Sequence, residues 1–148
     1  MITKEHYIKK TCLFCASDYH LEMILLPYIK EKIDNSNIII FTENDLEESV
    51  NVLLTKINLD EKYKDKIKRL SWKHTDDLYM DEINNEKDKN VYIIINGSYN
   101  YIELVNNKIK EFVKKDVEVV DCIHIGDSDI DITEISKKYE KILNTQKI

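Results

Sequence analysis

The sequence predicts an α/β fold: a three-layer, doubly wound sandwich with a five-stranded parallel sheet, of the Rossmann-like or flavodoxin-like kind. Five short apolar stretches alternate along the chain with segments of helical periodicity, and this alternation is typical of a parallel sheet with helices on both faces. The clearest stretch, 91–95, reads Val-Tyr-Ile-Ile-Ile without polar alternation, which indicates a strand covered on both faces. The length of 148 residues predicts a single α/β domain, 1–148.

Each predicted strand is a short apolar stretch, and the five are 11–16, 37–41, 67–72, 91–95 and 117–125. The third is weaker than the others, because Lys68 and Arg69 interrupt it. The fifth carries Glu118, Asp121 and His124 among its apolar residues, which favours a place at the edge of the sheet.

Helical patterns follow the strands. Apolar residues recur at spacings of three and four, and they predict helices over 21–33, 46–57, 78–83, 99–114 and 132–143. Pro27 lies inside the first of these helices and removes one intrahelical hydrogen bond, so either a kink or a helix start only a few residues before Pro27 is expected. The charged segment 58–66 is expected to hold a helical turn.

Composition argues against two classes of partner. The net charge is −6 and Arg69 is the only arginine among 22 basic residues, so no basic face for nucleic acid is expected. There is no apolar run near the ~20 residues that a membrane helix needs. The first ten residues lack the apolar core of a secretory signal, and a cytoplasmic location is expected.

Cys12 and Cys15 have the spacing of a C-x-x-C motif, but Leu13 and Phe14 between them indicate the body of a strand. Residues three apart in a strand point to opposite faces, so the two thiols are not expected to share a metal or a disulfide. We predict that both are buried, reduced and unreactive.

Sequence motifs identify no cofactor. The only glycines are Gly97 and Gly126, so there is no dinucleotide fingerprint, no phosphate-binding P-loop and no G-x-S-x-G nucleophile elbow. The segment Asn96-Gly97-Ser98 precedes a predicted helix, and its backbone N–H groups could cradle an anion.

A ligand site is expected where the strands end, since ligands of open α/β sheets bind outside the carboxyl ends of the strands. Polar residues follow all five predicted strands: Ser17, Asp18 and His20; Thr42, Glu43 and Asn44; His74, Thr75 and Asp76; Asn96, Gly97 and Ser98; Asp127, Ser128 and Asp129. Each group also suits an ordinary helix N-cap. The predicted ligand-binding residues come from the loops after the first and fourth predicted strands: Ser17, Asp18, His20, Asn96, Gly97, Ser98 and Tyr99.

Two functions fit this pattern. The first is a regulatory or binding domain for a small polar molecule or a protein partner, without catalysis. The alternative is a small hydrolase or transferase that uses Asp18 and His20 with His74 or Asp76, with a divalent metal as an option. Strand order would discriminate: the first strand next to the third would favour the enzyme, and next to the fourth would favour a ligand with an anionic end. The sequence does not determine the oligomeric state, and it is compatible with a homodimer.

Overall fold

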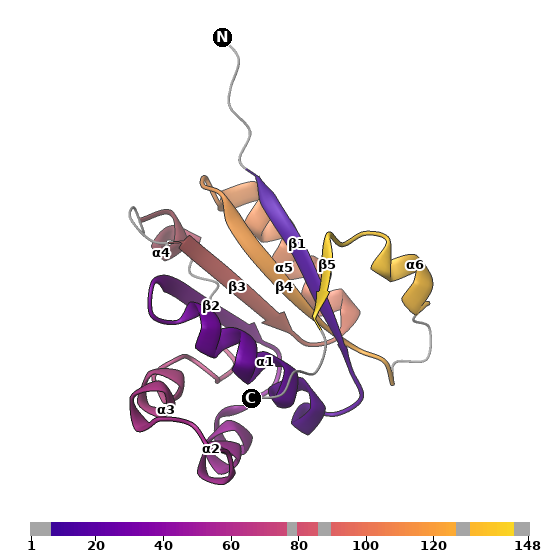
Figure 1. The fold of residues 1–148 in the computed structure, drawn as a ribbon. Coiled ribbons are helices and arrows are strands. Elements are labelled where there is room, and N and C mark those ends of the chain that lie inside the picture. Colours follow the sequence, from indigo (N-terminus) through magenta and orange to yellow (C-terminus); the bar gives the residue numbers. More distant parts are fainter. Residues whose placement is uncertain (1–6, 77–79, 86–89, 127–130, 144–148) are drawn as a thin grey trace.

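A five-stranded sheet in which every strand pair is parallel forms the centre of the computed structural model, which describes residues 7–76, 80–85, 90–126 and 131–143. Its strands are β1 (Ile8–Cys15), β2 (Ser36–Thr42), β3 (Asn90–Asn96), β4 (Val117–His124) and β5 (Lys141–Leu143). The order across the sheet is β2-β3-β4-β1-β5 (Figure 1).

Helices cover both faces of the sheet, which confirms the predicted three-layer sandwich (Figure 1). One face is covered by α1 (Asp18–Lys32), against which α2 (Glu47–Lys56) and α3 (Glu61–Lys68) pack. The other face carries α4 (Met80–Asn85), α5 (Tyr99–Phe112) and α6 (Ile132–Ser136).

Alternate side chains of the strands enter two separate cores. Ile93 and Ile95 point to the α5 side and Ile94 to the α1 side, and all three are fully buried as predicted. The same alternation puts Cys12 in the α5 core and Cys15 in the α1 core. Cys12, Cys15 and Cys122 form no disulfide and are all buried, as expected for structural cysteines.

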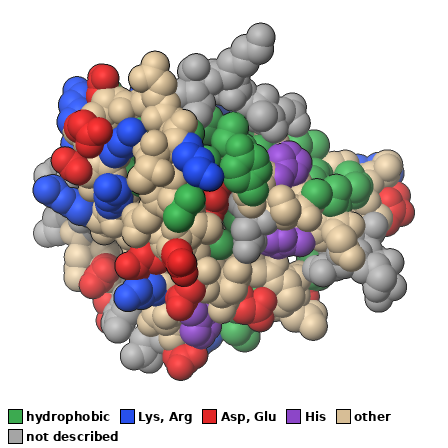
Figure 2. Space-filling view, turned by 90° about the horizontal axis from the view of Figure 1, so that it is seen from below, with side chains coloured by type: hydrophobic (Ala, Val, Ile, Leu, Met, Phe, Trp, Pro, Cys, Tyr) green, Lys and Arg blue, Asp and Glu red, His purple; other side chains and the backbone are tan. Residues whose placement is uncertain are grey.

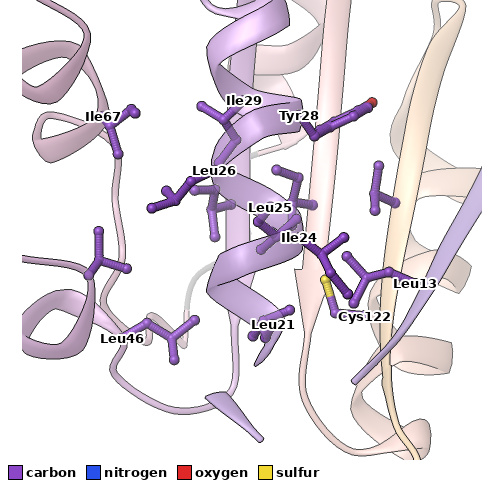
Figure 3. Packing of buried hydrophobic residues seen from close by; sticks show 14 of the residues in the cluster. Leu13, Leu21, Ile24, Leu25, Leu26, Tyr28, Ile29, Leu46, Ile67 and Cys122 are labelled. Carbon is purple, nitrogen blue, oxygen red and sulfur yellow. The ribbon is translucent and has the colours of Figure 1, made fainter. Parts of the chain in front are cut away.

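The core on the α1 side is built around that helix, which runs unbroken through Pro27. Figure 3 shows Leu21 and Ile24 pointing toward the sheet, near Leu13 and Cys122. Buried residues on other sides of α1 contact α2 and α3, so this helix is apolar over much of its surface.

Two element predictions were wrong, and both concern the edges of the sheet. Residues 67–72 are not a strand: Ile67 belongs to α3, where Tyr63 and Ile67 have helical spacing, and buried Trp72 donates a hydrogen bond from Nε1 to the Ile67 carbonyl (2.8 Å). The fifth strand is instead Lys141–Leu143, which pairs with β1 in the segment predicted to end the last helix.

The edge position predicted for the strand 117–125 was also wrong. Residues 117–124 form β4, which is the middle strand of the sheet. Its polar side chains are tolerated there because they have partners. Glu118 accepts hydrogen bonds from Thr11 Oγ1 and Tyr28 Oη, each at 3.0 Å, and Asp121 lies 2.7 Å from Lys10 Nζ. The isoleucines of β3 accordingly lie on an interior strand beside the middle one.

Candidate functional site

The strand order puts a switch point between β1 and β4, because the connection from β1 to β2 and the connection from β4 to β5 cross the sheet in opposite directions. After β1 the chain enters α1 on one face, whereas α6, which follows β4, lies on the other. Neighbouring strands whose connections leave toward opposite faces create the crevice in which open α/β sheets bind ligands. Neither order weighed from the sequence occurs. The predicted third strand, 67–72, is not a strand, and the predicted fourth, 91–95, is β3, whereas the neighbours of β1 are β4 and β5.

A row of polar side chains crosses the carboxyl ends of the strands at this crevice. His124 Nε2 lies 2.8 Å from Asn96 Oδ1, and His124 Nδ1 lies 3.6 Å from Cys15 Sγ. The amide of Asn96 in turn donates from Nδ2 to Thr42 Oγ1 (3.0 Å) and Asn44 Oδ1 (3.1 Å). Figure 2 views this end of the molecule and shows histidine side chains on its surface.

The hydrogen bonds fix the orientation of the His124 ring. Because the Asn96 amide nitrogen donates elsewhere, its oxygen is free to accept the Nε2–H of His124. The sequence pattern predicts His124 in an edge strand and does not link it to Asn96. The pairing depends on two residues 28 positions apart that become neighbours only when β3 pairs with β4.

A thiol, an imidazole and an amide in this sequence of contacts can form a nucleophilic triad. Here the thiol is inaccessible: Cys15 is fully buried, and its Sγ also lies 3.6 Å from the Ile123 carbonyl. With no exposed sulfur surface, this row serves as a buried polar link that ends at a half-buried imidazole.

Two of the predicted residues in the loop after β1 have structural contacts. Ser17 Oγ accepts from the His20 backbone N–H (3.1 Å) and caps α1. His20 Nδ1 accepts from the Ala16 N–H (3.1 Å), and its ring is partly exposed. Asp18 begins α1, but its side chain lies outside the part of the chain that the structure describes, as do residues 127–130.

The loop after β3 already contacts an anionic side chain, that of Glu43 from the loop after β2. Glu43 Oε1 accepts from the Ser98 N–H at 2.8 Å, and Ser98 Oγ caps α5 by accepting from the Tyr101 N–H (3.2 Å). Gly97 is buried, and a Cβ there would lie 2.7 Å from Tyr101 Cδ1 and 2.8 Å from Glu43 Cβ. Close packing therefore requires this glycine, and a ligand anion would have to displace the Glu43 carboxylate.

The residues named for the alternative enzyme lie at the carboxyl ends of two different strands, β1 and β2. His74 contacts the Thr42 carbonyl at the end of β2 and Asp76 Oδ1, each at 2.9 Å. The ends of β1 and β2 are separated by β4 and β3, roughly 14 Å at the usual strand spacing. In the described part of the chain, His20 and His74 are not in contact, and no group of three or more His, Cys, Asp or Glu could hold a metal ion.

A cavity of about 400 Å³, here called the α5–α6 cavity, lies elsewhere, between α5 and the residues that directly follow α6, and Tyr99 lines it rather than the crevice. At its base Asp121 accepts from Lys10 Nζ (2.7 Å), Tyr139 Oη (2.6 Å) and Asn106 Nδ2 (3.0 Å). Burial lowers the pKa of Lys10 and raises that of Tyr139. The sequence pattern does not predict this cluster, because Lys10 precedes the first predicted strand, 11–16, and Tyr139 lies in the predicted helix 132–143.

No protein-family model, curated protein or solved structure matches the chain. Among the described residues, no helix is both long enough and apolar enough to span a membrane.

Proposed function

We propose that this chain is a regulatory or ligand-binding α/β domain whose site is the crevice between the carboxyl ends of β1 and β4. The site comprises Ser17, Asp18 and His20 from the loop after β1, and Asn96, which acts through His124. One observation carries the proposal: β1 and β4 are neighbours, and the chain continues from them in opposite directions across the sheet, to β2 and to β5, over opposite faces.

The ring of His124 supports this location. It is half-buried at the end of the middle strand, and Asn96 holds its orientation from behind. A rigidly held imidazole beside the loop of His20 offers a ligand directional hydrogen bonds at little entropic cost. A small polar molecule fits this arrangement, and a polar side chain of a protein partner would be recognised in the same way.

The remaining predicted residues, Gly97, Ser98 and Tyr99, act only indirectly in this proposal. Gly97 and Ser98 follow Asn96, and they hold the start of α5 against Glu43. In this proposal they position Asn96, while Tyr99 faces the separate α5–α6 cavity. The alternative hydrolase or transferase is less favoured, because its two histidine pairs lie at different strand ends.

A thermal-shift screen against nucleotides, flavins, divalent metals, amino acids and small polyols tests the proposal, since a ligand held by the native state raises the melting temperature. His124→Gln keeps an amide nitrogen near Asn96 but removes the imidazole, and His20→Ala removes the second ring. Both should reduce the shift produced by a hit. His74→Gln is the matched control and should leave it unchanged. A hit whose shift persists in both site variants would contradict the proposal.

A further inference from the structure

The α5–α6 cavity has the features of a second ligand site, on the face of the sheet away from α1. Its volume of about 400 Å³ is in the range of small-molecule pockets. Its inner surface is made by the cluster of Lys10, Asn106, Asp121 and Tyr139, and its outer surface includes exposed Lys110 and Lys138.

The inner cluster leaves donors rather than acceptors for a ligand. The carboxylate of Asp121, only 2% exposed, already accepts from three side chains. The Lys10 ammonium has three N–H donors, and its described hydrogen bonds, to Asp121 and to Asn106 Oδ1, use two. A ligand acceptor would therefore find the remaining donor, whereas a ligand cation would find no free carboxylate oxygen in this cluster.

The outer surface adds positive charge. Lys138 Nζ donates to Tyr99 Oη at 3.4 Å, and no ion pair among the described residues includes Lys110 or Lys138. Burial is the main cause of the lowered pKa of Lys10, and repulsion from the charge of Lys110, which also lines the cavity, lowers it further. An anion between them would remove that repulsion. Glu103 is the one outer carboxylate among the described lining residues.

We propose that this cavity binds a small aromatic oxyanion, a carboxylate or a phosphate ester. The oxyanion lies among Lys10, Lys110 and Lys138, and the ring packs against Tyr99 and Ile102. Aromatic contact and charge-assisted hydrogen bonds then act on the two ends of one molecule.

Titrations followed by backbone-amide NMR test this site with four probes: phenyl phosphate, benzoate, benzyl alcohol and inorganic phosphate. The two aromatic anions should shift the amides of Tyr99, Asn106 and Tyr139, and which of them binds more tightly identifies the phosphate ester or the carboxylate as the preferred source. Benzyl alcohol has only the aromatic ring and inorganic phosphate has only the oxyanion, so each should bind more weakly than either aromatic anion. Equal binding of benzyl alcohol, or no shift at these amides with either aromatic anion, would overturn the proposal.

Charge-matched variants separate this site from general attraction of anions. Lys110→Gln and Lys138→Gln should each weaken binding of the preferred aromatic anion roughly three- to tenfold, the range expected for a partly exposed charge-assisted hydrogen bond. Lys108→Gln on α5 and Lys137→Gln at the C-cap of α6 change the charge equally but lie outside the described lining, and should leave affinity unchanged. Equal weakening by all four variants would refute a specific site. The result does not depend on the β1–β4 crevice, whose amides at His20 and His124 report separately.

Discussion

At the scale of single residues, hydrogen-bond partners decide what each polar group can do. Cys15, His124 and Asn96 have the chemistry of a nucleophilic triad, but complete burial of the thiol removes the access that a nucleophile needs. Burial also raises the pKa of Cys12 to about 11 and that of Cys122 well above its ordinary value. These two thiols therefore stay protonated near neutral pH.

We predict that all three cysteines resist modification in the native protein. A thiol reagent added under native conditions should label none of them within the time that labels all three in denaturant, as measured by mass spectrometry. Burial is the physical reason, since the reagent reaches buried sulfur only after unfolding. Fast, selective labelling of Cys15 would contradict this account and would make its contact with His124 catalytically relevant.

His74 is predicted to make stability depend on pH. Both ring nitrogens face acceptors, the Thr42 carbonyl and the Asp76 carboxylate, so the doubly protonated ring is favoured and the pKa is raised above its usual value of about 6.5. A folded-state pKa above the unfolded value gives stability that is fully present below the unfolded pKa and lost as pH rises through the folded pKa.

Denaturant unfolding of wild type and His74→Gln from acidic to mildly alkaline pH measures this effect. The wild-type advantage should be largest at low pH and shrink as His74 loses its proton. Asp76→Asn should lower the pKa of His74 in an NMR titration, which serves as the control. A stability difference that is constant across pH, or a His74 pKa below that of a model peptide, would show that these contacts do not favour the charged ring.

At the scale of elements, α1 and the interior strands, β3 among them, are buried on more than one side. α1 lies between the sheet and the α2–α3 layer, and β3 lies between two strands and two helical layers. Elements placed in this way should contribute most to stability, because their side chains lose nearly all contact with water. The three-residue β5, with Ile142 41% exposed, is the opposite case.

Ile94→Ala should lower the free energy of unfolding by about 2–5 kcal/mol, because it leaves a cavity in the fully buried α1 core. Ile142→Ala makes the same chemical change on the exposed edge strand and should cost less than about 1 kcal/mol. Chemical denaturation of both variants gives the comparison. Similar losses in the two proteins would show that β3 does not have the interior role described here.

At the scale of the whole molecule, local patterns predicted the layers but not the order of the strands. Val91–Ile95 could be recognised because burial on both faces leaves a continuous apolar run. β4 was misplaced because Glu118 and Asp121 look like edge residues until Tyr28 and Lys10, distant in sequence, supply their partners. Strand order depends on such long-range pairing, which no local pattern contains.

For the candidate site, too, the sequence predicts where residues lie along the strands but not which of them pair. The carboxyl ends of the strands follow from the fold class, and Ser17 and His20 follow from the position of the first strand. The pairing of His124 with Asn96 and the partnership of Glu43 with Ser98 require the strand order, so sequence patterns named one member of each pair as a ligand residue and left the other unlinked.

Backbone-amide NMR mapping of a thermal-shift hit tests the central claim, that the site is the crevice between β1 and β4, most directly. The largest shifts should fall on Ala16 to His20 and on Cys122 to Gly126, the two segments that border the crevice. Shifts centred instead on α2 and α3, with the β1 and β4 ends unchanged, would contradict it.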